Sequence, residues 1–262
     1  MEAAHEAILD WYGREARDLP WRRTRDPYAI LVSEVMLQQT QVVRVVPRYE
    51  GWLRRWPDAQ ALADAPVADV LRAWVGLGYN RRALRLHEAC VVVAREGWPT
   101  SAAGLRRLPG VGPYTAAAVA SFAFGEVVAA VDVNVARVTE RWGLGTPAEL
   151  LPRDPVRAAT WNQAMMELGA TVCRARRTEC PRCPAGGFCN ARGAPEVPPR
   201  GANRPGAERF EDSNRWVRGR VIAALSAGEG LPDIGADRLS PALAGLERDG
   251  LVVREGDTFR LP

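Results

Sequence analysis

Apolar residues recur at intervals of three and four along most of this chain, from residue 2 to about residue 142. One such series is Val67, Leu71 and Trp74. This spacing places side chains on one face of an α-helix, whereas the strict alternation of a half-buried strand is scarce. Proline and glycine interrupt the pattern often, which predicts many short helices. The sequence therefore predicts an all-α core, which residues 145–170 continue with a helix from about Pro155 to Cys173.

The last part of the chain departs from this pattern. A stretch rich in proline, glycine and arginine predicts a linker at residues 196–206. Residues 213–225 are expected to form a helix, and a second helix is expected to begin at Ser240-Pro241. Two short apolar runs then flank Glu255-Gly256-Asp257, a turn typical of a hairpin. Residues 207–262 therefore predict a small winged-helix-like module, which either contacts DNA or only packs.

A glycine-rich segment predicts how the helical part meets a ligand. It reads Leu108-Pro109-Gly110-Val111-Gly112-Pro113-Tyr114-Thr115. We expect the preceding helix to stop at Pro109-Gly110, and Gly110 and Gly112 to be free to adopt positive φ. Pro113 suits the first turn of a new helix, whose N-terminus favours a phosphate. This indicates a helix–hairpin–helix motif that grips a nucleic-acid backbone without reading its sequence. The alternative is a plain turn between helices with glycine at the cap.

All 35 basic residues of the chain are arginines, and its formal net charge is +4 with a pI of about 9.0. A guanidinium binds two phosphate oxygens at once, so the composition suits a phosphate-rich partner. Lysine is absent, so no side-chain amine is available to form a Schiff base with a sugar aldehyde. Lyase chemistry of that kind would have to use the N-terminal amine.

The composition otherwise matches an ordinary globular protein, with 47% hydrophobic and 25% charged residues. No stretch approaches the length that a membrane span needs. The first residues include acids and no apolar segment, so we expect no signal peptide. We therefore expect a cytoplasmic protein.

Four of the five cysteines form a cluster with the spacing C-x6-C-x2-C-x5-C. They are Cys173, Cys180, Cys183 and Cys189. A cytoplasmic location disfavours disulfides and favours a metal. Structural zinc sites usually combine two short knuckles, and only one is present here, so the wide first gap favours a [4Fe–4S] cluster over zinc. The fifth cysteine, Cys90, lies in an apolar helical run and is expected in the core.

The first gap of this cysteine cluster is rich in arginine. It contains Arg174, Arg176 and Arg177. On a loop held by a metal these side chains suit contacts with DNA phosphates. The alternative is a loop that is merely solvated.

Two acids lie in apolar sequence contexts. Glu34 follows Ala29-Ile30-Leu31-Val32-Ser33, and Asp132 lies between Val131 and Val133. An apolar setting raises the pKa of a carboxyl group and prepares it to act as a general acid near neutral pH. The alternative for Glu34 is a carboxylate that points outward from an amphipathic helix. Asp132 is also suited to cap the helix that begins there. Two such acids in a chain with a motif that binds the DNA backbone suggest cleavage of a glycosidic bond.

Five features occur in order and together carry a resemblance. They are Ser33-Glu34-Val35-Met36-Leu37-Gln38-Gln39-Thr40-Gln41-Val42, Trp74-Val75-Gly76-Leu77-Gly78-Tyr79, Leu108-Pro109-Gly110-Val111-Gly112, Val131-Asp132-Val133-Asn134-Val135 and the four clustered cysteines. In combination they closely resemble the MutY-type adenine DNA glycosylases of the helix–hairpin–helix superfamily. The resemblance covers about residues 8–195.

This resemblance implies a fold of two α-helical domains with the active site in the cleft between them. Residues 22–125 would form a six-helix domain that contains the helix–hairpin–helix motif. Residues 1–21 and 126–195 would form a second domain, in which the four cysteines hold a [4Fe–4S] cluster. The implied partner is double-stranded DNA with a mispaired adenine, bound by a monomeric protein at the nucleoid.

The resemblance also implies the chemistry. Adenine opposite 8-oxoguanine or guanine would be flipped out of the duplex. Glu34 matches the acid that protonates the adenine ring, and Asp132 matches the carboxylate that stabilises the cationic sugar. Tyr114 and Asn134 match residues that hydrogen-bond these acids. Bifunctional relatives of the endonuclease III type carry lysine at the position of Tyr114, so this chain is expected to be monofunctional and to leave an abasic site.

Further positions match DNA contacts in the family. Wedge residues that enter the base stack are Gln39, Leu77 and Tyr79, and the hairpin contributes Pro109, Gly110, Val111 and Gly112. The lining of the adenine pocket is matched by Arg17, Trp21, Arg22, Leu37 and Gln163. Trp21 and Leu37 are equally compatible with a core position. His87 matches no catalytic position.

The chain departs from the family at its C-terminal part, where most members carry a domain that resembles the hydrolase for oxidised guanine nucleotides. The short segment here is expected to differ from it, so adenine excision is better supported than strict 8-oxoguanine preference. The segment around Trp21 also resembles thymine glycosylases that act at G mismatches, which makes a thymine or uracil glycosylase one alternative. A non-catalytic iron–sulfur regulator that binds DNA is another.

Overall fold

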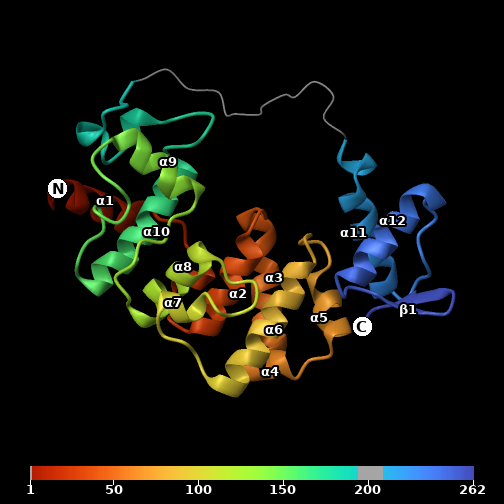
Figure 1. The fold of residues 1–262 in the computed structure, drawn as a ribbon. Coiled ribbons are helices and arrows are strands. Elements are labelled where there is room, and N and C mark those ends of the chain that lie inside the picture. The colour runs from red at the N-terminus through yellow and green to blue at the C-terminus, as the bar shows by residue number, and fades with distance from the viewer. Residues whose placement is uncertain (1, 194–208) are drawn as a thin grey trace. The chain divides into compact units, whose positions relative to one another are not determined.

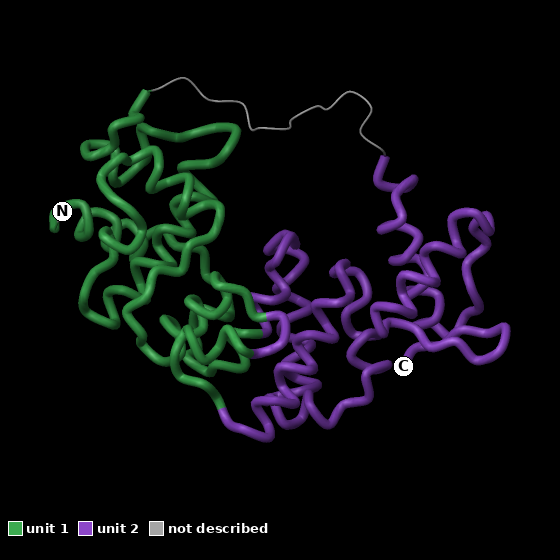
Figure 2. The backbone as a smooth tube through the Cα atoms, viewed as in Figure 1, with its two compact units in different colours: residues 1–31, 98–107, 111–203 green, residues 32–97, 108–110, 204–262 purple. Residues whose placement is uncertain are grey.

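The computed structural model describes residues 2–193 and 209–262. The linker predicted at residues 196–206 lies outside the described residues. The chain divides into two compact units, one of residues 1–31, 98–107 and 111–203 and the other of residues 32–97, 108–110 and 204–262 (Figure 2). The division into functional domains given above stays a prediction.

The first unit is built from helices around a main apolar core, with a smaller apolar cluster at Ala117, Ala118 and Ala130. Its helices are α1 (Glu2–Glu15), α7 (Ala102–Leu105), α8 (Pro113–Phe124), α9 (Val133–Trp142) and α10 (Pro155–Thr171). Helix α10 packs against α1, α8 and α9 (Figure 1). The core side chains of α1, α9 and α10 include Ile8, Trp11, Val138, Trp142, Trp161 and Leu168. Three short 3₁₀ turns, Pro20–Arg22, Cys180–Arg182 and Gly186–Phe188, complete the unit.

The part of the second unit before the C-terminal module contains four helices and the C-terminal part of α2 (Pro27–Leu37). The four are α3 (Val42–Arg55), α4 (Ala59–Ala63), α5 (Val67–Trp74) and α6 (Arg81–Glu96). Helix α6 packs on α4 and α5. The ring of Trp52 lies edge-on to those of Trp56 and Trp74, with centroid distances of 4.7 Å and 5.5 Å. Cys90 is fully buried, which confirms its predicted core position, and burial raises its pKa to about 12.

The C-terminal module follows as a 3₁₀ turn, two helices and a hairpin, all within the second unit. These are Phe210–Asp212, α11 (Asn214–Ser226), α12 (Ala236–Arg248), β1 (Val253–Glu255) and β2 (Thr258–Arg260). The strands pair antiparallel with Val253 opposite Arg260. Helix α11 packs on α12 and on α5. The predicted helix and hairpin are confirmed, while the winged-helix assignment stays a prediction.

Two helix boundaries differ from the sequence expectation. Helix α12 begins at Ala236 and contains Pro241 in its second turn. Gly235 at the N-cap and Asp237 in the first turn start the helix earlier than Ser240-Pro241, and the helix continues past Pro241 despite the missing backbone donor. Helix α7 ends at Leu105, before Pro109-Gly110, because two backbone turns fill the residues between.

Helices predominate throughout the described residues, as the apolar periodicity predicts, and β1 and β2 form their one sheet. No helix in residues 2–193 or 209–262 is both long enough and apolar enough to cross a membrane.

Candidate active site

Glu34 lies on α2, the most uniformly buried helix of the chain. Glu34 is 5% exposed, and every residue from Tyr28 to Met36 is buried. A helix that is apolar all round is a buried helix, so Glu34 is enclosed instead of pointing into solvent. Glutamate is seldom this deeply buried, which makes the position a candidate for chemistry.

Asp132 is the N-cap of α9, as the sequence predicts. Its Oδ1 accepts hydrogen bonds from the backbone N–H of Asn134 at 2.9 Å and of Val135 at 2.7 Å. Its Oδ2 accepts from Nδ2 of Asn134 at 2.7 Å. The neighbouring Val131 and Val133 are 39% and 78% exposed, so they do not bury the carboxylate as the sequence suggested. Three donors therefore fix both oxygens of a half-buried carboxylate.

Arg137 holds Asn134 in this orientation, one turn further along α9. Its Nη2 donates to Oδ1 of Asn134 at 2.9 Å and to the carbonyl of Gly169 at 2.6 Å, and its Nε donates to the carbonyl of Cys173 at 2.9 Å. Because the Asn134 amide oxygen faces Arg137, its nitrogen faces Asp132. Burial lowers the pKa of Arg137. The sequence analysis missed this residue, although its spacing of three from Asn134 on one helix is a usable signal.

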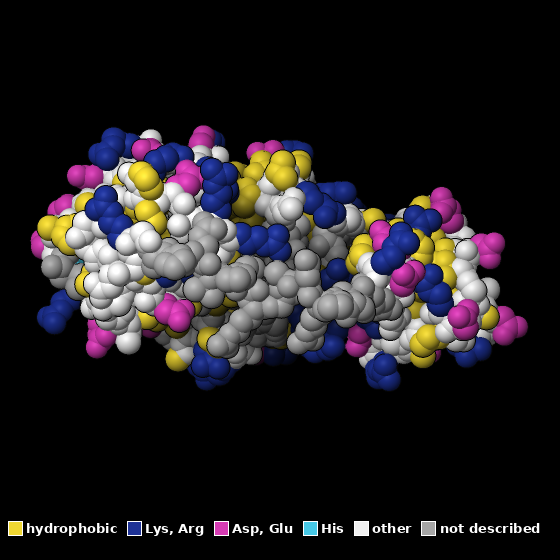
Figure 3. Space-filling view, turned by 90° about the horizontal axis from the view of Figure 1, so that it is seen from above, with side chains coloured by type: hydrophobic (Ala, Val, Ile, Leu, Met, Phe, Trp, Pro, Cys, Tyr) yellow, Lys and Arg dark blue, Asp and Glu magenta, His cyan; other side chains and the backbone are white. Residues whose placement is uncertain are grey.

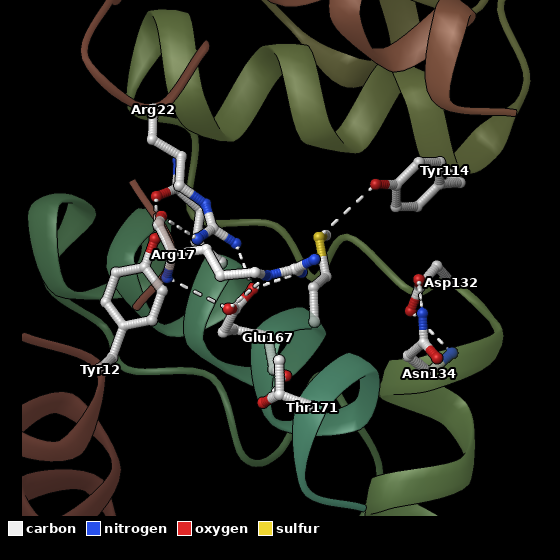
Figure 4. Close-up of polar contacts among 10 residues, drawn as sticks. Tyr12, Arg17, Arg22, Tyr114, Asp132, Asn134, Glu167 and Thr171 are labelled. Atoms are coloured by element: carbon white, nitrogen blue, oxygen red, sulfur yellow. Dashed lines mark hydrogen bonds and ion pairs between the residues drawn. The ribbon is translucent and has the colours of Figure 1, made fainter. Parts of the chain in front are cut away.

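Tyr114 lies at the start of α8. Its hydroxyl donates to Sδ of Met166 on α10 at 3.5 Å (Figure 4). Figure 4 shows Tyr114 and the Asp132–Asn134 pair beside the same helix, α10. The first unit therefore gathers three of the four predicted catalytic residues around α10.

Two of the five predicted pocket residues pair with Glu167, which the sequence patterns do not mark, and a third, Gln163, lies one turn before it on α10. Arg17 donates from Nε and Nη2 to the two carboxylate oxygens, each at 2.7 Å, and Arg22 donates from Nη2 at 2.7 Å (Figure 4). The Tyr12 hydroxyl donates a hydrogen bond to Oε1 of Gln163 at 2.8 Å. The guanidinium of Arg22 lies over the Tyr12 ring, 5.3 Å from the ring centroid. Burial alone raises the pKa of Glu167, but the two guanidinium groups bring it below its usual value.

The other two predicted pocket residues, Trp21 and Leu37, differ in burial. Trp21 is 8% exposed within the 3₁₀ turn Pro20–Arg22, and Leu37 is half-buried at the C-terminal end of α2. Trp21 therefore fits the core position that the sequence left open.

The predicted wedge residues lie on two strained loops of the second unit. Gln39 and Tyr79 have φ values of 55° and 48°, and no other non-glycine residue among those described has a positive φ. Such conformations are costly for residues with a side chain and occur preferentially at functional sites. Both side chains are exposed, whereas Leu77 is 6% exposed. The two loops thus present Gln39 and Tyr79 outward and keep Leu77 inside.

Arg82 joins these two loops, and the sequence analysis missed it. Its guanidinium donates to the carbonyls of Val35, Met36 and Gln38 at 2.8, 3.1 and 2.6 Å. It also donates to the carbonyls of Leu77 and Gly78, both at 2.9 Å. Burial lowers the pKa of Arg82 to about 10. One guanidinium therefore satisfies carbonyls at the C-terminal end of α2 and holds the loop that carries Tyr79.

Of the two glycines in the glycine-rich hairpin for which the sequence predicts freedom to adopt positive φ, only one adopts it. Gly110 has a φ of 74°, and a Cβ there would lie 2.5 Å from the Cβ of Arg85. Gly112 instead is extended, with a φ of −81°, and caps α8, whose first residue is Pro113. Only Gly110 thus requires glycine.

The four clustered cysteines lie close to one another and to the core of the first unit. All four are free thiols, and three of them pack against that core. Burial raises the pKa of Cys183 to about 11, with further contributions from Cys173, Cys189 and Cys180. Arg141 donates to Sγ of Cys173 at 3.3 Å. Within the described part of the chain no group of three or more His, Cys, Asp or Glu side chains is arranged to hold a single metal ion.

The arginines of the cysteine loop are exposed. Arg174 pairs with Glu179, and its carbonyl accepts from Arg141 at 3.1 Å. Arg176 and Arg177 lie at the exposed tip of the loop between Cys173 and Thr178, which form an isolated bridge.

Comparisons with known proteins place this geometry in context. Residues 32–155 match the family model of the HhH-GPD superfamily base excision DNA repair proteins. An adenine DNA glycosylase of Mycobacterium tuberculosis is 44% identical over 283 residues, covering 97% of this chain and 92% of that protein. One from Mycolicibacterium smegmatis is 46% identical, covering 86% and 81%. The structure of a thermostable thymine-DNA glycosylase aligns with a TM-score of 0.66 and 29% identity, covering 72% of this chain and 94% of that one.

Proposed function

The chain belongs to the adenine DNA glycosylases of the HhH-GPD superfamily, which act in base excision repair, and on this basis we propose that it removes adenine mispaired with 8-oxoguanine or guanine. The reaction is hydrolysis of the N-glycosidic bond in double-stranded DNA. The burial of Glu34 within an otherwise apolar helix is the observation that carries the proposal.

Glu34 is the general acid of this reaction. Its proton passes to the ring of the flipped adenine while the glycosidic bond breaks, and the bonding electrons leave with the base. Water then adds to the sugar carbon and returns a proton to the carboxylate. The burial of Glu34 in α2 places this acid where bulk water is largely excluded.

Asp132 stabilises the cationic sugar that forms when the base leaves. A charge that develops in the transition state is best stabilised by a group already held in place. The three hydrogen bonds to Asp132 fix both oxygens in advance. Asn134 is therefore a positioning residue for Asp132, and Arg137 positions Asn134 in turn.

We propose that the enzyme lacks lyase activity. Cleavage of the DNA strand through a Schiff base requires an amine, and the chain contains no lysine. Tyr114 stands at the position where bifunctional relatives carry lysine. The product is then an intact strand with an abasic site.

DNA contacts come from three parts of the chain in this proposal. The hairpin around Gly110 and the N-terminus of α8 hold the backbone. Gln39 and Tyr79 enter the base stack from strained loops, which keep both side chains outward. Arg174, Arg176 and Arg177 add phosphate contacts from the cysteine loop.

Cys173, Cys180, Cys183 and Cys189 would hold a [4Fe–4S] cluster. All four cysteines are free thiols, and Arg141 donates a hydrogen bond to Sγ of Cys173, a contact that suits a thiolate ligand at that position. A cluster binds each thiolate at a different iron, so it does not require the compact arrangement of a single-ion site. When bound, the cluster supplies a rigid brace for the arginine loop.

A thymine glycosylase acting at G mismatches is the second candidate, because the solved thymine-DNA glycosylase shares 29% identity with this chain. Glu34 favours adenine, since thymine has no ring nitrogen of comparable basicity for a general acid to protonate.

The experiment that tests the proposal compares base release from four duplexes in single turnover. They carry A opposite 8-oxoguanine, A opposite G, T opposite G and U opposite G. We expect release of adenine, with strand breaks only after treatment with alkali. Release of thymine or uracil instead would support the second candidate. Tight binding without release from any duplex would support a DNA-binding regulator.

The cofactor has a separate test. The full chain, purified without oxygen, should be brown, contain about four iron and four sulfide ions per chain, and absorb broadly in the visible range. Cys183→Ser should lose most of this absorbance, whereas Cys90→Ser should keep it because Cys90 lies in the other unit. Colourless protein that contains zinc would contradict the cluster.

A further inference from the structure

A pocket of about 1040 Å³ opens in the second unit between the loop that carries Tyr79 and helix α11. Six arginines line it, namely Arg44, Arg81, Arg82, Arg215, Arg218 and Arg220. Three aromatic residues, Tyr79, Phe210 and Trp216, line it as well. None of the described lining residues is an aspartate or a glutamate. The function proposed above uses Gln39 and Tyr79 from this lining but assigns no role to the six arginines or to Phe210 and Trp216.

The positive charge of the pocket is largely uncompensated within the described residues. Asp249 pairs with Arg218 and lies 3.5 Å from Arg81, and the other four lining arginines form no ion pair with a described carboxylate. The positive charge therefore exceeds what one carboxylate can neutralise. Such a concentration of like charge attracts an anion.

The aromatic residues are placed among these charges. The guanidinium of Arg215 lies over the rings of Tyr79 and Phe210, with distances to the centroids of 5.1 Å and 4.7 Å, and it donates to the Tyr79 hydroxyl. Arg220 lies 5.9 Å from the centroid of Trp216. In the space-filling view, arginine, apolar and acidic side chains lie beside one another on the part formed by α11 and α12 (Figure 3).

This combination identifies the chemistry of the ligand. Grooves that bind nucleic-acid strands combine basic side chains along the phosphates with aromatic rings on which bases stack. An acidic protein segment would use the charges but not the ring faces. The volume lies at the upper end of the range for small-ligand pockets, so it is sufficient for a nucleotide.

We propose that this pocket is a DNA-binding site that holds one nucleotide next to the point where Tyr79 enters the duplex, with its phosphate on the arginines and its base on the aromatic rings. The inference rests on the proposed function, which places Tyr79 in DNA. It gives the C-terminal module a role in binding the strand.

The test measures binding of the full chain to a labelled duplex with 2′-fluoro-deoxyadenosine opposite 8-oxoguanine, which resists base release. Fluorescence anisotropy gives the affinity between 50 and 300 mM salt. Because each phosphate contact contributes roughly 0.9 to the slope of log affinity against log salt, R215A/R220A should reduce that slope by about two. Both side chains are exposed, so the variant is expected to fold.

Two further variants make the test specific. Phe210→Leu removes a stacking surface but no charge, so it should weaken binding about fivefold or more and leave the salt slope unchanged. Arg254→Ala removes a charge from β1 in the same module but outside the pocket, so it should leave the slope unchanged. An unchanged slope in R215A/R220A, or an equal fall in Arg254→Ala, would overturn the proposal.

Base release by the wild-type chain separates this inference from the proposed function. If adenine is released from an ordinary duplex and the slope is unchanged in R215A/R220A, the pocket fails as a DNA site while the enzyme activity stands. If no base is released but the slope falls as expected, the DNA site stands and the proposed reaction fails.

Discussion

Glu167 is the residue on which the predicted adenine-pocket side chains of the first unit depend. It is fully buried and pairs with Arg17 and Arg22, so Glu167→Gln leaves two guanidinium groups without their anion. Removing one partner of a buried pair is strongly destabilising, and we expect a loss of about 3 kcal/mol in the free energy of unfolding at pH 7. Urea denaturation measures it.

The pH dependence of this loss follows from the lowered pKa of Glu167. A carboxyl group whose folded pKa lies below its unfolded value, here 4.5, stabilises the protein above that value. This stabilisation disappears as the pH falls through the folded pKa. The difference between wild type and Glu167→Gln should therefore shrink below pH 4.5. Glu6→Gln, which breaks an exposed pair with Arg157, should have a much smaller effect at pH 7. Equal effects of the two variants would contradict the assignment.

Arg82 is expected to matter for both stability and DNA binding. Arg82→Lys keeps a positive charge, but a single ammonium group cannot reach the carbonyls of both loops that the guanidinium joins. We expect the variant to lose about 2 kcal/mol of stability, because buried carbonyls lose charged donors. DNA affinity should fall as well, since the loops of Gln39 and Tyr79 loosen.

The control for Arg82 lies one turn further along α6. Arg85→Lys changes an exposed side chain that pairs with Glu88 and contacts neither loop. It should keep wild-type stability and affinity. If Arg82→Lys binds DNA like the wild type, the loops do not depend on Arg82.

At the residue scale, the sequence could identify groups whose local context is unusual. The apolar run around Glu34 predicts its burial, and the position of Asp132 before a helix predicts its cap. The local sequence around Glu167 and Arg82 gives no comparable signal. Arg82 reaches carbonyls more than 40 residues away in sequence, and Glu167 pairs with residues about 150 positions away. Only the folded chain reveals these partners.

At the scale of elements, the two glycines of the hairpin offer a matched comparison. Gly110→Ala places a side chain at positive φ, within 2.5 Å of Arg85, whereas Gly112→Ala meets nothing within 4 Å and has an ordinary φ. We expect Gly110→Ala to cost about 1–3 kcal/mol of stability and to weaken DNA binding. Gly112→Ala should be close to neutral in urea denaturation. The reverse order would show that the backbone of the hairpin differs from the one described.

The sequence predicts the helices well because caps and periodicity are local signals. Asp154 accepts from the backbone of Arg157 and Pro155 starts α10, as in the predicted helix from Pro155. The predicted start of α12 at Ser240-Pro241 is wrong, because a proline that suits a first turn lies in the second turn here. The helix begins five residues earlier at Gly235-Ala236, and its packing against α11 outweighs one missing hydrogen bond.

At the scale of the whole molecule, the sequence shows how much charge is present but not where it acts. The chain carries 35 arginines against 31 acids. The arginine pocket assembles side chains from residues 39–82 and 210–251, two segments that more than 120 residues separate. Composition alone therefore predicts a phosphate-rich partner, whereas the folded second unit shows where six of the arginines gather.

In the proposed reaction Glu34 supplies the proton for adenine release. The most direct measurement is the single-turnover rate of adenine release from a duplex with A opposite 8-oxoguanine, with enzyme in excess, for wild type and Glu34→Gln. Glu88→Gln, an exposed change on α6, is the control and should keep the wild-type rate. We predict that Glu34→Gln releases adenine at least about a hundredfold more slowly while it still binds the duplex and unfolds at the wild-type temperature. Release by Glu34→Gln at the wild-type rate would exclude Glu34 as the general acid.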